Sequence, residues 1–344
     1  MRIGYVFVAI AALFGLCGAA SAAGAGFGVG ATFPYPVYAA WADGYNKASG
    51  QRVNYQSIGS GGGIAQIEAG TVTFGASDVP MLAAERDKVG LVQFPTIIGG
   101  VVPIVHLKGV APGQLILSGP VLADIFRGGI RHWNDPAIKA LNPGLTLPNR
   151  AIAIVTRSDK SGTTYTFTTY LARFVADWGK TIGVGIGVNW PAEVIGAKGT
   201  EGLANHVMHA EGAIGFVEYT YARQNQLGYV RLRNKAGKIV TPGAASFKAA
   251  ASGVDWDAAG ARPDEAVDML DSAADGAWPI TAPTYVLMRK KPTDKADAAS
   301  VLAFFDWAFS HGDGAAEKLD YVPLPAAAKA RVHQIWKQID SNGL

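Results

Sequence analysis

The sequence has very little cysteine and few charged residues. Its one cysteine, Cys17, lies within the first 22 residues, so the rest of the chain has no thiol for a disulfide, a metal site or nucleophilic catalysis. Charged residues make up 17% of the 344 residues, and the formal net charge of +3 is too small to indicate nucleic-acid binding. Beyond the N-terminus no apolar stretch is long enough to span a membrane. What is abundant is glycine, with 43 residues, and 49% of the chain is hydrophobic, which indicates a turn-rich globular protein with a large core.

The N-terminus has the three parts of a secretory signal peptide. Arg2 precedes an apolar stretch that ends at Leu16, and the small residues Ala20-Ser21-Ala22 follow. The apolar stretch is shorter than the roughly 20 residues that a membrane-spanning helix needs. Leu16 is also not the small residue that normally precedes a lipid-modified cysteine, so Cys17 is not expected to carry a lipid. We therefore expect a signal peptide over residues 1–22 and export of a soluble protein.

After the signal peptide, short β-like runs alternate with helical runs, a pattern typical of α/β architecture. Such pairs are 53–57 before 64–69, 73–77 before 83–89, and 151–156 before 165–178.

Two long β-branched passages, Phe94–Val105 and Trp278–Met288, are each long enough to run from one lobe to another. If both are crossovers, residues 23–100 plus 282–344 form lobe I and residues 101–281 form lobe II. The last predicted helix, Ala326–Ile339, has an apolar face that should pack on the first lobe.

Three segments have the pattern of a helix start that can receive an anion, because unpaired backbone N–H groups lie there. In TRSDKSGTTYTF, Arg157 and the run Ser161-Gly162-Thr163 follow an apolar run and precede a helix. Thr32-Phe33 precedes a proline suited to an early helix position, and Ser60 lies at the expected N-cap of a glycine-rich turn. For TRSDKSGTTYTF the alternative is a simple helix cap at Ser161 or Thr163, with Arg157 as a solvated charge, and Asp78 in FGASDVP is equally interpretable as a cap.

Four other interpretations fail on context. The Gly26-x-Gly28-x-x-Ala31 match has no strand before it, and the P-loop pattern is absent from the sequence. Ser60 does not fit a hydrolase elbow, because Ile58 stands where that motif requires glycine. His206 and His209 make a weak metal site without a third ligand. We therefore expect no catalytic residues, no metal and no cofactor.

Seven segments in collinear order resemble the periplasmic phosphate-binding proteins of bacterial ABC transporters. The segments are GATFPYPVYAAWADGYNK, YQSIGSGGGIAQI, FGASDVPM, FPTIIGGVV, RSDKSGTTYTFTTYLA, GAIGFVEY and AWPIT. The resemblance covers essentially the whole chain after the signal peptide. It implies an α/β, two-lobed periplasmic binding protein fold, type II-like, with two hinge crossovers and the ligand in the interlobe cleft.

The resemblance also implies a phosphate-binding set, which in this chain comprises Thr32, Phe33, Ser60, Asp78, Arg157, Ser161, Gly162 and Thr163. Three neighbouring positions differ from the usual family pattern. Thr156 and Gly61 stand where arginine and serine are frequent, and Lys160 stands where glycine or another small residue is frequent.

The implied function is capture of inorganic phosphate in the periplasm and its delivery to a membrane permease with a cytoplasmic ATPase. The protein is expected to be a monomer with no nucleic-acid partner. A phosphatase is the first alternative, but it would need a metal cluster or an activated nucleophile. The second is a phosphate sensor or a binding protein for another tetrahedral oxyanion. Asp78 argues against other anions, and nothing in the sequence excludes the sensor.

Overall fold

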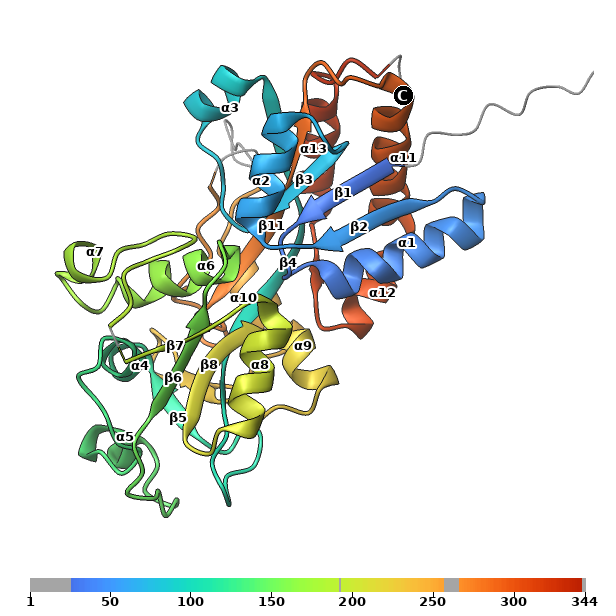
Figure 1. The fold of residues 1–344 in the computed structure, drawn as a ribbon. Coiled ribbons are helices and arrows are strands. Elements are labelled where there is room, and N and C mark those ends of the chain that lie inside the picture. The colour runs from blue at the N-terminus through green and yellow to red at the C-terminus, as the bar shows by residue number, and fades with distance from the viewer. Residues whose placement is uncertain (1–25, 192, 257–265, 342–344) are drawn as a thin grey trace, which may run out of the picture.

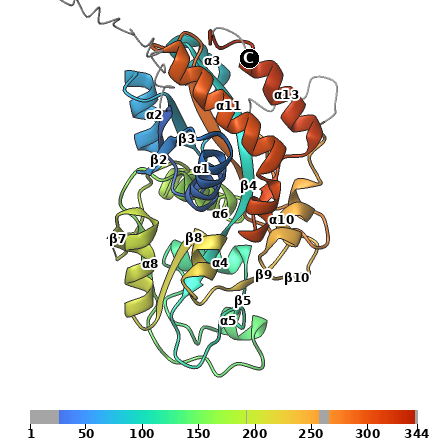
Figure 2. The same ribbon diagram turned by 90° about the vertical axis from the view of Figure 1, so that its right-hand side faces the viewer.

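A computed structural model describes residues 26–191, 193–256 and 266–341, so the predicted signal peptide lies outside the described residues. The protein is a mixed α/β molecule in which both ends of the described chain lie in one half and its middle lies in the other (Figure 1). The same division is visible after a quarter turn about the vertical axis (Figure 2). The α/β prediction is confirmed.

Within the described ranges, most strands join one curled mixed sheet in the order β2-β1-β3-β11-β4-β8-β6-β7, and β12 pairs with β4. Its strands are β1 (Gly26–Gly30), β2 (Val53–Ser57), β3 (Phe74–Ser77), β4 (Leu91–Val105), β6 (Ala153–Arg157), β7 (Ile195–Ala197), β8 (Ala213–Glu218), β11 (Thr281–Arg289) and β12 (Val322–Pro323). A smaller sheet has the order β10-β9-β5, with β5 (Ile116–Ser118), β9 (Arg231–Arg233) and β10 (Ile239–Val240).

The helices divide between the two halves in the same way. The half that holds both ends of the described chain contains α1 (Tyr35–Ser49), α2 (Ser60–Ala69), α3 (Ala83–Val89), α11 (Lys295–His311), α12 (Asp313–Lys318) and α13 (Ala326–Trp336). The other half contains α4 (Gly119–Phe126), α5 (Pro136–Leu141), α6 (Gly162–Leu171), α7 (Trp178–Thr181), α8 (Gly199–His209), α9 (Tyr219–Gln224) and α10 (Ala244–Ala251). In the described part of the chain, no helix combines the length and apolarity that crossing a membrane requires.

Strand β4 belongs to both halves of the molecule. All of its residues are buried, which explains why its sequence is mostly apolar, with Gln93 and Thr96 as the exceptions, rather than alternating. It pairs with β11 from Leu91 to Gly100 and with β8 from Val101 onward. The change of partner between Gly100 and Val101 supports the predicted lobe boundary, which stays a prediction. At Gly100 a Cβ atom would lie 2.1 Å from the Phe247 ring, so glycine is required for that ring to pack on the strand.

Aromatic side chains fill the core of the half that holds both chain ends. Phe305 is fully buried and makes edge contacts with the rings of Tyr38, Phe74 and Phe94. Trp336 of α13 packs against Phe94 at a ring-centroid distance of 5.6 Å. The prediction that the last helix packs on this half is confirmed.

Among the predicted boundaries that were wrong are two helix ends and one helix cap. The helix predicted over residues 165–178 is α6, which ends at Leu171, followed by a turn and the short α7. After Leu171 the N–H groups of Arg173 and Phe174 donate to carbonyls three residues earlier, so the chain tightens into turns. The helix predicted to end at Ile339 is α13, which ends at Trp336 and continues as tight turns. The helical spacing of apolar residues continues through the turns that follow α6 and α13. This spacing therefore could not locate the end of either helix.

The third wrong boundary concerns Ser60, which was predicted to be an N-cap. The N-cap of α2 is Gly59, with φ +88°, and Ser60 is the first helical residue. Gly59 takes this conformation because its N–H group and that of Ile58 both donate to the Gly30 carbonyl.

Candidate functional site

Three helix starts converge at the junction between the two halves. They are the starts of α1, α2 and α6, and each follows a strand of the large sheet directly or after a short turn. Arg157 lies at the end of β6, and the other predicted site residues lie at these starts or directly after β3. All eight are buried: Thr32, Phe33, Ser60, Asp78, Arg157, Ser161, Gly162 and Thr163. The carboxyl ends of neighbouring parallel strands meet at one edge of a sheet, which is where α/β proteins place ligands. The structure therefore brings the predicted residues together.

Several backbone N–H groups at this junction have no backbone acceptor within the described ranges. They belong to Thr32, Phe33, Ser60, Gly162 and Thr163. The first N–H groups of a helix have no partner inside the helix, and they carry the positive end of its dipole. Their gathering at one buried place suits a small anion.

Ser161 is also a helix cap, as the alternative interpretation predicted. Its hydroxyl accepts a hydrogen bond from the Thr164 N–H group at 3.2 Å. Asp78, in contrast, is not a cap, because the next helix, α3, begins at Ala83 with Leu82 as its N-cap. The cap interpretation therefore holds for Ser161 and is wrong for Asp78.

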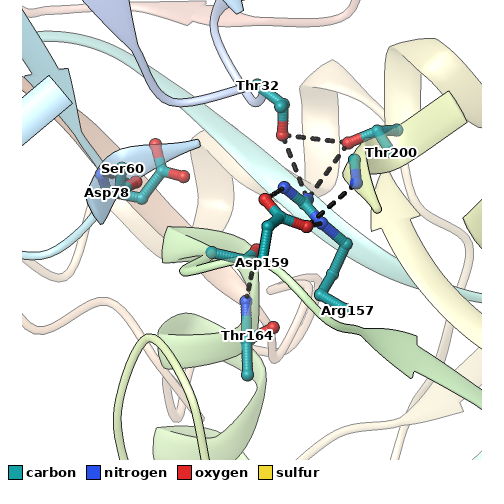
Figure 3. Close-up of polar contacts among 9 residues, drawn as sticks. Thr32, Ser60, Asp78, Arg157, Asp159, Thr164 and Thr200 are labelled. Carbon is teal, nitrogen blue, oxygen red and sulfur yellow. Dashed lines mark hydrogen bonds and ion pairs between the residues drawn. The ribbon is translucent and has the colours of Figure 1, made fainter. Parts of the chain in front are cut away.

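Arg157 ends β6 and is held in place by a carboxylate that the sequence analysis did not assign to the site. Its Nε donates to Asp159 Oδ1 at 2.7 Å, and its Nη2 donates to Oδ2, so the pair forms a fork (Figure 3). Asp159 Oδ1 also accepts the Gly199 N–H group at 2.9 Å. Burial raises the pKa of Asp159, but its hydrogen bonds and the charge of Arg157 outweigh that effect and hold the pKa below its ordinary value.

The third guanidinium nitrogen of Arg157 contacts one residue from each half of the molecule. Nη1 donates to the hydroxyls of Thr32 at 3.3 Å and Thr200 at 3.4 Å. Arg157 is thus buried, and the interpretation of this arginine as a solvated charge is wrong. The short R-x-D spacing in RSDKSGT was the sequence signal that could have identified Asp159.

Asp78 is a buried carboxylate beside helix starts. Its Oδ1 accepts a hydrogen bond from the Thr284 hydroxyl at 2.6 Å, whereas its Oδ2 has no hydrogen-bond partner among the described residues. Burial raises the pKa of Asp78 from 3.8 to about 7, against the opposing effects of the Thr284 bond and the Arg157 charge. The junction therefore offers many donors and one carboxylate acceptor.

The two sides of the site are in contact. A Cβ atom at Gly162 would lie 2.2 Å from Ser60 Oγ and 2.7 Å from Asp78 Oδ2, so a larger residue could not fit there. The Gly61 N–H group donates to the Lys160 carbonyl at 3.1 Å, which joins α2 to the segment before α6. The start of α6 is thus closed over the start of α2.

Among the described residues, no hydrogen-bonded pair of a nucleophile and a base occurs at this site. Ser60 Oγ accepts the Asp78 N–H group at 3.2 Å and has no histidine as a hydrogen-bond partner among the residues described. Over the same residues no three metal-ligating side chains lie close enough to hold an ion, and His206 and His209 are exposed on α8.

The fold and the site define the class of two-lobed binding proteins, and comparison with known proteins agrees. A family model described as "PBP superfamily domain" matches residues 18–311. The chain is 49% identical over 309 residues to "Phosphate-binding protein PstS" of Xylella fastidiosa (strain Temecula1), covering 90% of this chain and 84% of that protein. It is 50% identical over 310 residues to the protein of the same name in Haemophilus influenzae, covering 90% and 92%. The chain belongs to this family, whose members are substrate-binding proteins and not enzymes.

Solved structures show the same fold at lower sequence identity. A high-affinity periplasmic phosphate-binding protein with bound phosphate has a TM-score of 0.73 and 23% identity, covering 90% of this chain and 93% of that chain. A phosphate-binding protein from Stenotrophomonas maltophilia has a TM-score of 0.69 and 20% identity, with the same coverage. The predicted two-lobed periplasmic binding protein fold is confirmed.

Proposed function

We propose that this protein binds inorganic phosphate in the periplasm and delivers it to an ABC-type import permease. The relatives at about 50% identity carry the name phosphate-binding protein, which supports the ligand and the transport role. We further propose that the protein is an exported monomer that loses residues 1–22, and that its permease is driven by a cytoplasmic ATPase.

The proposed ligand set is the one predicted from the sequence. Arg157 supplies a buried positive charge, and the starts of α1, α2 and α6 supply N–H groups and hydroxyls. One group of ligands comes from residues 23–100 and the other from residues 101–281, which we propose as parts of lobes I and II. Since each lobe carries half of the ligands, binding is coupled to closure at the hinge.

The observation that carries the proposal is the free Oδ2 of Asp78 beside these donors. A carboxylate repels an anion unless that anion brings a proton. Phosphate near neutral pH still carries at least one proton, so it can donate an O–H bond to Asp78, and such charge-assisted bonds are short and strong. Sulfate has no proton and would face Asp78 with a second acceptor. The site thus selects phosphate over sulfate by repulsion.

Calorimetric titration of phosphate and sulfate at pH 8.5, above the raised pKa of Asp78, tests this mechanism, because Asp78 is then ionised and phosphate still carries one proton. The wild type should bind phosphate at micromolar or lower concentration and bind sulfate negligibly, and arsenate should compete because it is protonated like phosphate. Asp78→Asn should lower the ratio of phosphate affinity to sulfate affinity, since an amide can donate a hydrogen bond to either anion. Asp43→Asn, at an exposed carboxylate of α1, is the matched control. Comparable sulfate binding by the wild type, or an unchanged ratio in Asp78→Asn, would refute the mechanism.

Loss of the guanidinium tests the location of the site. Arg157→Ala should weaken phosphate binding by about 2 to 5 kcal/mol, because it removes a buried charged donor and leaves Asp159 unpaired. Arg127→Ala, at an exposed arginine of the same half, should leave the affinity unchanged. Equal affinities of the two variants would show that the anion binds elsewhere.

A further inference from the structure

Thr200 lies at the site although no sequence motif pointed to it. It stands in the first turn of α8 and is buried, with 5% of its surface exposed. Its Oγ1 lies 2.9 Å from Thr32 Oγ1 and 3.4 Å from Arg157 Nη1, and the three groups form a closed triangle (Figure 3). Thr200 and Thr32 are 168 positions apart in the sequence and belong to opposite halves of the molecule.

The backbone before Thr200 fixes its position. Gly199 has φ +73°, a conformation that glycine adopts without strain. Its N–H group donates to Asp159 Oδ1 at 2.9 Å, so the carboxylate that holds Arg157 also holds the start of α8. The Thr200 hydroxyl does not cap its own helix. Helix capping therefore does not explain this residue.

The directions of the hydrogen bonds in the triangle follow from its chemistry. A guanidinium can only donate, so both threonine hydroxyls accept from Arg157 Nη1. Thr200 donates its own proton to Thr32 Oγ1. Thr32 Oγ1 consequently accepts two bonds, and its proton has no acceptor in the described part of the chain.

We propose that Thr200 is a positioning residue of the anion site, which makes the Thr32 hydroxyl an obligatory donor to the bound anion. Both lone pairs of Thr32 Oγ1 are engaged by Arg157 and Thr200, so Thr32 can offer a ligand only its proton. Asp78 is the complementary group, since its Oδ2 can only accept when the carboxyl group is ionised. Together the two residues distinguish an unprotonated oxygen from a protonated oxygen on the same tetrahedral anion. This inference rests on the proposed function and adds to it a residue outside the family's usual ligand set.

The pair Thr200→Val and Thr200→Ser separates this role from simple packing. Valine keeps the shape of threonine and loses the hydroxyl, whereas serine keeps the hydroxyl and loses the methyl group. If Thr200 only fills space, valine should be tolerated and serine should be harmful. If Thr200 positions Thr32, the order is reversed.

The experiment measures phosphate affinity by calorimetry, phosphate release by stopped flow, and thermal unfolding without phosphate. Thr200→Val should raise the dissociation constant roughly threefold to tenfold, as expected for one net hydrogen bond, mainly through faster release. Thr200→Ser should stay within about twofold of the wild type, as should the control Thr241→Val at an exposed position. In a Thr32→Val background, Thr200→Val should have no further effect, because the hydroxyl that it positions is gone.

Two kinds of failure are distinguishable. If the wild type does not bind phosphate, the proposed function itself is wrong. If the wild type binds phosphate but Thr200→Val matches it, or if serine is more harmful than valine, the positioning role alone is overturned. Additive effects of the Thr32 and Thr200 substitutions would also overturn it.

Discussion

The buried carboxylate of Asp78 should make the ligand-free protein less stable as pH rises towards neutrality. Its pKa is raised from 3.8 to about 7 in the folded protein, chiefly by burial. Between these two values the folded protein still holds the proton and the unfolded chain has released it, so the free energy of unfolding falls as pH rises and levels off above about pH 7. A pKa difference of this size corresponds to about 4 kcal/mol. Asp78→Asn removes the titrating group and should remove this loss.

The measurement is urea unfolding of phosphate-free wild type and Asp78→Asn from pH 4 to pH 9, with Asp43→Asn as the exposed control. The wild type should lose up to about 4 kcal/mol relative to Asp78→Asn over this range. If the lobes opened, Asp78 would reach water and ionise without unfolding of the protein, and the loss of stability would be smaller. Small-angle scattering at each pH must therefore accompany the unfolding curves. The argument would be refuted if the free energy of unfolding changed with pH in the same way in the wild type and in Asp78→Asn while the particle size of both stayed constant. Burial would then not raise the free energy of the ionised Asp78 by the expected amount.

Three further substitutions probe tightly packed positions. Gly162→Ala should abolish tight phosphate binding in calorimetry, because its Cβ would lie 2.2 Å from Ser60 Oγ and keep the site from closing; wild-type affinity would contradict this. Gly61→Ala should weaken phosphate binding because its Cβ would lie 2.4 Å from Lys160 Cβ. Adding Lys160→Gly should restore the affinity. If the double variant binds no better than Gly61→Ala, this contact does not limit binding. Phe305→Ala should lower the free energy of unfolding by about 3 to 5 kcal/mol in denaturant titrations, since it leaves a cavity among aromatic rings; a loss below about 1 kcal/mol would show that the core collapses around it.

Much of the fold could be predicted because its signals are local. The alternation of β-like and helical runs indicated the α/β class, and the mostly apolar sequence of β4 is typical of a strand buried on both faces. Tertiary contacts were less predictable. The Arg173 guanidinium, just past the end of α6, reaches Asp268 and the Leu270 carbonyl. That contact joins positions nearly one hundred residues apart, and no local pattern contains it.

The candidate site also contains some residues that could be predicted from the sequence and others that could not. Each helix start carries unpaired N–H groups wherever it lies in the molecule, so Ser60 and the Ser161-Gly162-Thr163 run could be chosen as anion ligands from the sequence. Asp78 was ambiguous, because an aspartate after a strand is as often a cap as a ligand. The position of α3, which begins five residues later at Ala83, removes the cap interpretation.

The sequence by itself thus determined the chemistry that each segment offers: the helix starts, the arginine and the carboxylate. The tertiary structure alone decided which groups meet. It placed Thr200 against Thr32 and gave Asp78 a raised pKa, because burial and hydrogen bonding between distant positions depend on the order of the strands and on contact between the two halves. Backbone donors are fixed by neighbours in the chain, whereas the environment of a buried side chain is fixed by residues from elsewhere in the chain.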